Sequence, residues 1–87
     1  MISQTVVIKN ASGLHARPAV NFVSTAKQFK SNVRVHSGTR AVNGKSIVAV
    51  LSAGIASNSE IRLEIDGEDE AAAMQTILEA IESGLGE

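Results

Sequence analysis

The sequence predicts an α+β fold, an open-faced β-sandwich in which three helices cover one face of a four-stranded antiparallel sheet. Its 87 residues suffice for one small domain, spanning 1–87. Segments whose apolar residues recur every second position alternate with segments in which they recur every third or fourth, in the order βαββαβα. Two of the predicted strands alternate polar and apolar residues, which is typical of an antiparallel sheet with one face open to water.

The first half of the chain is expected to form a strand, a helix and a hairpin. Segment 5–8 is rich in β-branched residues and predicts a strand. Because proline suits a first helical turn, Pro18 places the start of the helix near residue 15 or 16. The buried face of this helix is indicated by Ala19, Phe22, Val23, Ala26 and Phe29. Segments 32–36 and 39–42 alternate with a period of two, and the hairpin turn is expected at 37–38.

The second half begins with an ambiguous segment, 47–53. Its valines and isoleucines favour a buried strand, whereas two alanines and Ser46 as a cap favour a short helix, and we expect the helix. Segment 61–65 alternates cleanly and predicts a half-exposed strand. The last helix should open at the acidic run 68–70 and end at Gly84. Its apolar face is marked by Met74, Ile77, Leu78, Ile81 and Leu85.

Composition excludes several classes of function. The formal net charge of -1 leaves no basic stripe for a nucleic acid, and neither of the two phenylalanines is predicted to lie on a strand, where RNA-binding sheets stack bases. Without cysteine there is no disulfide, thiolate nucleophile or cysteine-ligated zinc. The longest apolar run, 47–51, is far shorter than the ~18 residues of a membrane span, and residues 1–4 do not resemble a signal peptide. We therefore expect a cytoplasmic monomer without cofactor, metal, nucleic-acid partner or membrane insertion.

Two other polar features are interpreted as structural. His36 is expected at the surface, on a strand beside the hairpin turn. The carboxylates of Asp66, Glu68, Asp69 and Glu70 are interpreted as the solvated start of the last helix and not as a cation site, because acidic side chains stabilise a helix N-terminus.

Residues 13–19, Gly-Leu-His-Ala-Arg-Pro-Ala, place a histidine at a helix start and an arginine two positions later. The first N–H groups of a helix lack intrahelical partners and attract anions. Arg17 adds a planar guanidinium suited to phosphate oxygens, and a neutral imidazole such as that of His15 is a nucleophile near pH 7. These residues fit an anion site. A histidine at a helix start is, however, more often a solvent-exposed cap, so the pattern alone leaves both alternatives open.

The same heptapeptide resembles the active-site motif of the HPr family, the histidine-containing phosphocarriers of the bacterial phosphoenolpyruvate:sugar phosphotransferase system. Residues 42–47, Val-Asn-Gly-Lys-Ser-Ile, are similar to the regulatory-serine segment of that family, and 52–55 and 84–87 also look HPr-like. The resemblance covers essentially the whole chain. It implies the βαββαβα open-faced sandwich, in agreement with the periodicity.

The resemblance also implies a function. His15 would be phosphorylated on Nδ1 by the phosphoenolpyruvate-dependent Enzyme I, Arg17 would hold the phosphate, and the phosphoryl group would pass to IIA domains of sugar permeases. The chain would then be a carrier, itself a substrate and not an enzyme. A regulatory interaction module and a phosphocarrier of a nitrogen-regulatory branch remain as alternatives. The presence of His15 argues against the regulatory paralogues that have lost this histidine.

Ser46 has two compatible interpretations, a helix N-cap and a phosphorylation site. In Gram-positive members of the family, the matching serine is phosphorylated by HPr kinase/phosphorylase, and the product acts with a catabolite-control transcription regulator. The resemblance thus implies regulation at Ser46.

A docking surface is expected on the two helices nearest His15. Ala16, Val20 and Lys27 fall on one side of the first helix, away from its core face. The short helix cannot bury all its apolar residues against a sheet, so some of Ile47, Val48, Val50 and Leu51 must be exposed. Spare apolar surface beside a basic site often marks an interface, although short helices also carry scattered surface hydrophobes. The resemblance favours partner docking by Ala16, Val20, Lys27, Ile47, Val48 and Leu51.

Overall fold

The computed structural model describes residues 1–86, so Glu87, the last residue of the HPr-like segment 84–87, lies outside the described residues. The elements are, in chain order, β1 (Ile2–Val7), α1 (Ala16–Lys27), β2 (Asn32–Ser37), β3 (Arg40–Asn43), α2 (Ile47–Ser52), β4 (Glu60–Asp66) and α3 (Glu70–Glu82). This is the predicted order βαββαβα, and the ambiguous segment that begins at Ile47 is a helix, as expected.

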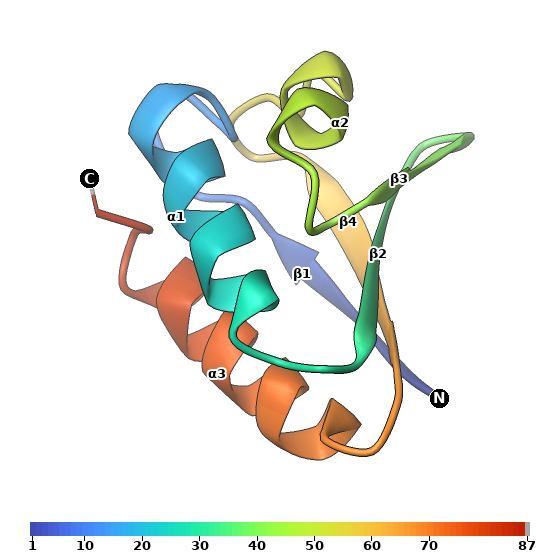
Figure 1. Ribbon diagram of the computed structural model, residues 1–87. Helices are drawn as coiled ribbons and strands as arrows, with labels where there is room; N and C mark the ends of the chain where they lie inside the picture. The colour runs from blue at the N-terminus through green and yellow to red at the C-terminus, as the bar shows by residue number, and fades with distance from the viewer. Residues whose placement is uncertain (87) are drawn as a thin grey trace.

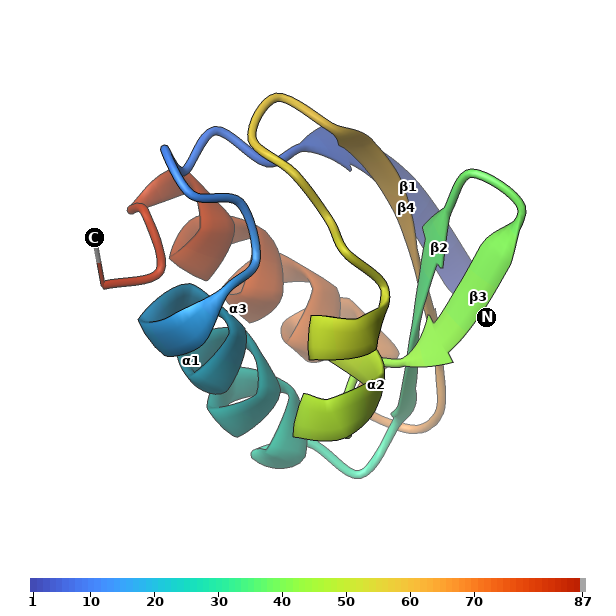
Figure 2. The same cartoon turned by 90° about the horizontal axis from the view of Figure 1, so that it is seen from above.

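The strands form one antiparallel sheet in the order β1-β4-β2-β3. The helices all lie on one side of this sheet, and its other side is open (Figures 1 and 2). α1 packs against both α2 and α3, so the helices form one continuous layer. The predicted fold class, a four-stranded antiparallel sheet covered on one face by three helices, is therefore confirmed.

The central strand β4 shows why one face of the sheet is buried and the other is exposed to solvent. Ile61, Leu63 and Ile65 are buried, whereas Arg62 between them is exposed. Val33 of β2 pairs with Ile65, so the apolar side chains of neighbouring strands share the inner face.

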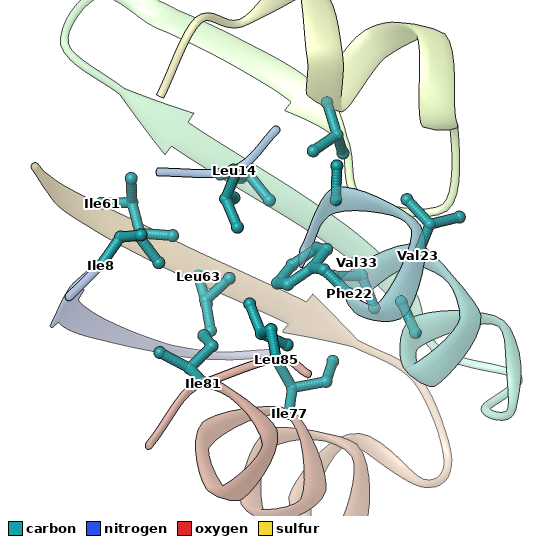
Figure 3. Close-up of a cluster of buried hydrophobic side chains, with 14 of the residues drawn as sticks. Ile8, Leu14, Phe22, Val23, Val33, Ile61, Leu63, Ile77, Ile81 and Leu85 are labelled. Atoms are coloured by element: carbon teal, nitrogen blue, oxygen red, sulfur yellow. The ribbon is translucent and has the colours of Figure 1, made fainter. Parts of the chain in front are cut away.

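The core lies between this inner face and the helix layer (Figure 3). Phe22 of α1 is fully buried in it. Burying a side chain of this size contributes about 1.5–3 kcal/mol. Ala19, Val23 and Ala26 are buried beside it, as predicted, but Phe29 is only half-buried because α1 ends at Lys27 and Phe29 lies beyond it.

The predicted bounds of the first strand were wrong. β1 spans Ile2–Val7 and not 5–8. Ile8 has left the strand but is fully buried. Its N–H donates to the Ser59 carbonyl at 2.9 Å, and its carbonyl accepts the Asn58 N–H at 2.6 Å. The residue pairs with the loop before β4, a long-range contact that local periodicity does not reveal.

The hairpin turn was also misplaced, by one residue. Ser37 pairs with Arg40, so the turn consists of Gly38 and Thr39. Gly38 has a φ of +61°, as the first position of a tight two-residue hairpin turn requires.

The end of α3 brings the C-terminal segment back to α1. Gly84, predicted to end the helix, has a φ of +92°, and its N–H donates to the Ile81 carbonyl at 3.1 Å. The Leu85 N–H donates to the Ala80 carbonyl at 3.0 Å, and these two bonds together form a Schellman motif. Leu85 is buried, as predicted, although it lies beyond the helix. Its carbonyl accepts a hydrogen bond from Asn21 of α1.

Candidate functional site

His15 is exposed and immediately precedes α1. Its backbone is extended, with φ -123° and ψ 158°, and its side chain makes no capping hydrogen bond. The predicted position at the helix start is therefore confirmed. The imidazole is not used to cap the helix, so it is available for chemistry there.

The two residues before His15 anchor the loop that carries it. Leu14 is fully buried, and its N–H donates to the Ile55 carbonyl at 2.9 Å. Gly13 has a φ of +69°, and a Cβ at this position would lie 2.2 Å from the Ile55 carbonyl oxygen. No side chain fits that space, which is why glycine is required here. The loop is thereby fastened to the segment that follows α2.

Ala16, between His15 and Arg17, has a positive φ of +48°. Residues other than glycine rarely adopt this left-handed conformation, which costs roughly 1–3 kcal/mol and is concentrated at functional sites. It marks the change from extended backbone at His15 to the helix. Sequence reasoning missed it because alanine is a good helix former and gives no sign of unusual backbone.

Arg17 is exposed in the first turn of α1, a turn without acidic residues. Within residues 1–86, no carboxylate lies within 4.0 Å of its guanidinium. Its positive charge therefore adds to the partial positive charge of the helix N-terminus. An anion at the start of α1 would meet a planar guanidinium and unpaired backbone amides.

Ser46 is the N-cap of α2, as one of its two interpretations predicted. Its backbone is extended, and its Oγ accepts the Ala49 N–H at 3.2 Å. The residue is half-buried. The hydroxyl thus stabilises the helix start on a residue that is not fully buried.

The docking residues named from the sequence lie on two helices that pack against each other (Figure 2). On α1, Ala16, Val20 and Lys27 are exposed, Val20 by 44%. On α2, the expectation that some apolar residues face solvent is confirmed: Val48 is 77% exposed, and Ile47 and Leu51 are exposed as well, whereas Val50 is fully buried. We refer to Ala16, Val20, Lys27, Ile47, Val48 and Leu51 together as the α1–α2 surface.

Charge is divided along the chain in a way that the net charge conceals. All nine Asp and Glu residues occur from Glu60 onward, and Arg62 is the only Lys or Arg in that part. α1 and α2 belong to the part with basic residues and no acidic ones, whereas β4 and α3 hold carboxylates. Sequence reasoning missed this feature because the formal net charge of -1 averages the two parts.

His36 is less isolated than its interpretation as a plain surface residue assumed. It is half-buried on β2, and its Nε2 lies 3.2 Å from Oε1 of Glu64 on the adjacent strand β4. Arg62 lies 4.0 Å from the other oxygen of the same carboxylate. His36 therefore belongs to a small polar cluster on the open face of the sheet, which is the face away from His15.

The acidic run at the start of α3 is tied to two other parts of the chain. The hydroxyl of Ser31 and the N–H groups of Lys30 and Ser31 donate to the Asp69 carboxylate, and these bonds lower its pKa to about 2. The Met1 amino group lies 3.0 Å from Glu70, which raises the pKa of the amine and lowers that of the carboxyl. In residues 1–86, no group of three or more acidic or histidine side chains is arranged to hold a metal ion.

None of the helices within residues 1–86 combines the length and the hydropathy that crossing a membrane requires.

Comparison with known proteins identifies close relatives along the whole chain. A family model described as "PTS HPr component phosphorylation site" matches residues 2–83. The phosphocarrier protein HPr of Neisseria meningitidis serogroup A is 44% identical over 87 residues, which cover 100% of this chain and 98% of that protein. The multiphosphoryl transfer protein of Vibrio cholerae is 42% identical over 86 residues, which cover 95% of this chain and 22% of that protein.

Solved structures agree with these relatives. HPr-C-His from Thermoanaerobacter tengcongensis has a TM-score of 0.96 and 41% identity, with 100% of this chain and 98% of that chain covered. Crh, the Bacillus subtilis catabolite repression protein whose crystal structure is described as a domain-swapped dimer, has a TM-score of 0.76 and 33% identity, with 97% of each chain covered. With the family match and a full-length relative at 44% identity, the chain belongs to the HPr family, the phosphocarrier proteins of the phosphotransferase system.

Proposed function

We propose that this phosphocarrier accepts a phosphoryl group on His15 from phospho-Enzyme I and passes it to IIA domains of sugar permeases in the cytoplasm. The observation that carries the proposal is the exposed imidazole of His15, on an anchored loop at the start of α1. Arg17 follows within the first helical turn, without a carboxylate partner among the described residues. The protein would be the substrate of its partners and have no turnover of its own.

The chemistry consists of two displacements at phosphorus. In the first, the lone pair of His15 Nδ1, the atom that the family resemblance implies, attacks the phosphorus, and the donor leaves with the electron pair of its own bond to phosphorus. In the second, a nucleophile of the acceptor displaces His15, and the P–N bond electrons return to the imidazole. Phosphoryl transfer depends mainly on positioning and electrostatic stabilisation, which Arg17 and the first amides of α1 would supply.

Partners would dock on the α1–α2 surface. Val48 and Val20 supply apolar area, and Lys27 supplies positive charge. An interface with an apolar centre and a basic rim suits a partner whose surface is apolar and acidic. The surface must be free for docking, so we infer that the carrier works as a monomer, unlike the swapped dimer described for Crh.

Ser46 would regulate this docking once phosphorylated by HPr kinase/phosphorylase. A phosphate there adds about 1.5–2 negative charges, which a helix N-terminus tolerates. The same charge would stand next to Ile47 and repel an acidic partner. The phosphorylated form would then be free to act with a catabolite-control transcription regulator.

The carrier step is tested with phosphoenolpyruvate and purified Enzyme I. The protein should gain one acid-labile phosphate, and His15→Ala should abolish the labelling completely without changing the melting temperature, because the imidazole makes no capping bond. The measurement is the phosphate bound per chain before and after mild acid.

His36→Ala is the matched control, since it removes an imidazole from the opposite face of the molecule. It should be labelled like the wild type. Labelling that survives His15→Ala would contradict the proposal, and a wild-type protein that gains no phosphate would instead be an interaction module. Transfer to nitrogen-branch acceptors in place of IIA domains of sugar permeases would reassign the partners but not the site.

A further inference from the structure

The C-terminal segment 84–86 is fastened to other parts of the chain at two successive carbonyls. Asn21 Nδ2 donates to the Leu85 carbonyl at 2.8 Å, and Asn10 Nδ2 donates to the Gly84 carbonyl. The Leu85 side chain is buried in the core, 3% exposed. Two asparagine amides and one apolar anchor therefore hold this segment against α1, the loop before α1 and the core.

The next residue, Gly86, lies beside the aliphatic stem of Arg17. A Cβ at Gly86 would lie 3.4 Å from Cδ and 3.6 Å from Cγ of Arg17, which are ordinary van der Waals distances. The same Cβ would lie 2.3 Å from Nδ2 of Asn21, which is a clash. The glycine backbone is thus packed closely enough against the Asn21 amide to leave no space for a side chain.

Arg17 and Asn21 are neighbours on α1, because residues four apart share a helix face. The Arg17 side chain is long and flexible, and in residues 1–86 no carboxylate is near enough to fix its head group. The backbone at Gly86, which leaves room for no more than about a methyl group beside the stem, therefore limits the stem from outside the helix.

We propose that Asn21 is a positioning residue for Arg17. By holding the Leu85 carbonyl, Asn21 keeps Gly86 beside the Arg17 stem. This restricts the conformations of the Arg17 side chain before a phosphate binds. This inference rests on the proposed phosphoryl transfer at His15 and on the proposed role of Arg17 in it.

Restricting a side chain before it binds reduces the entropy lost on binding. Without the Asn21 amide, Arg17 would keep its charge but would have to be ordered during transfer. The expected loss is that of ordering one long side chain, about 2- to 10-fold in the rate of phosphoryl transfer.

The experiment measures the rate of transfer from phospho-Enzyme I in two backgrounds. Asn21→Ala should slow transfer about 2- to 10-fold in the wild-type background and should have no further effect in an Arg17→Ala background. Thr25→Val is the matched control, because it removes another side-chain hydrogen bond of α1, from Thr25 Oγ1 to the Asn21 carbonyl, without touching Leu85. Its transfer rate should equal that of the wild type. Melting temperatures of all variants report on the fold.

Two further measurements separate positioning from stability. Gly86→Ala should slow transfer in the same range, because its methyl group would clash with the Asn21 amide. The NMR order parameter of the Arg17 Nε–Hε group should fall in Asn21→Ala.

The outcomes distinguish this inference from the proposed function. Equal slowing by Asn21→Ala with and without Arg17 would show a merely structural role and overturn the inference, as would an unchanged rate in Asn21→Ala while Arg17→Ala is slow. A normal rate in Arg17→Ala would overturn the proposed role of Arg17, and the inference with it, while the carrier function at His15 would stand. A wild type that is not labelled on His15 would refute the proposed function itself.

Discussion

At the scale of single residues, His15 is presented by backbone conformations that ordinary side chains avoid. Gly13 turns with a φ of +69°, and Ala16 with +48°, on either side of the buried Leu14 and the exposed His15. Leu14 anchors the loop, so the left-handed residues Gly13 and Ala16 set the orientation of the His15 side chain at the surface. Gly13 is also required for steric reasons, because it packs directly on the backbone after α2 and leaves no space for a side chain.

Gly13→Ala is expected to destabilise the protein by about 2–5 kcal/mol. The left-handed backbone costs an L-residue roughly 1–2 kcal/mol, and the new methyl group would meet the Ile55 carbonyl at 2.2 Å, an overpacking that adds about 1–3 kcal/mol. The free energy of unfolding in urea measures the loss.

Gly38→Ala separates the cost of the left-handed backbone from the cost of overpacking. Gly38 has nearly the same φ, +61°, but a Cβ there would have no atom within 4 Å. Only the conformational cost remains, so we expect a loss of about 1–2 kcal/mol. Equal losses in the two variants would show that the Ile55 carbonyl moves away freely and that the loop is not anchored as described.

At the scale of elements, Asp69 joins the start of α3 to the segment that leads from α1 into β2. Its carboxylate accepts the N–H groups of Lys30 and Ser31, each at 2.9 Å, and the Ser31 hydroxyl. The carboxylate stabilises both elements at once, because it completes the hydrogen bonds of one turn and carries negative charge at a helix N-terminus.

Asp69→Asn should remove a part of the acid sensitivity of the fold. The pKa of Asp69 is about 2 in the folded protein, below the ~3.9 of an unfolded chain. The carboxylate therefore stabilises the fold fully above pH ~4, and this stability is lost as the pH falls towards 2. The variant should be less stable than the wild type at pH 7, with a gap that narrows between pH 4 and pH 2. Urea midpoints across this range measure the gap.

Glu79→Gln removes an exposed carboxylate from the same helix and serves as control. Its urea midpoint at pH 7 should stay close to that of the wild type. A gap for Asp69→Asn that stays constant from pH 7 to pH 2 would show that the hydrogen bonds of Asp69 do not depend on its charge.

The element order and most of the core could be predicted from periodicity, because strands such as β4 and the long helix α3 bury one face each. The predictions were wrong where residues distant in the sequence determine the local structure. Ile8 is buried by pairing with residues 58–59, which no local pattern indicates. At the site, the position of His15 at the helix start followed from local chemistry. The left-handed Ala16 and the closeness of Gly86 to the Arg17 stem depend on how separate segments pack, so sequence reasoning missed them.

At the scale of the whole molecule, the division of charge gives the protein an electric dipole. α1 carries Arg17 and Lys27, α2 carries no charged residue, and every Asp and Glu lies from Glu60 onward. Such a separation orients a protein in the field of a charged partner and raises its association rate. The α1–α2 surface would therefore be turned toward an acidic partner before contact.

Ser46→Asp should slow phosphoryl transfer from Enzyme I by weakening this attraction locally. Aspartate is a good N-cap, so α2 should stay folded while a negative charge appears beside Ile47. At low salt we expect about 2- to 10-fold slower transfer at limiting concentration. The difference should shrink as salt rises from 0.01 M to 1 M, because the screening length falls from about 30 Å to about 3 Å.

Ser3→Asp adds the same charge on the open face of the sheet, opposite Glu64 of β4 and away from the α1–α2 surface. If the net charge alone decided the rate, both variants would be slowed alike. If docking is local, Ser3→Asp keeps nearly the wild-type rate and only Ser46→Asp is slow. A slowing by Ser46→Asp that is the same at every salt concentration would contradict electrostatic repulsion. The negative charge at Ser46 would then act by changing α2 itself, and regulation at this serine would be conformational.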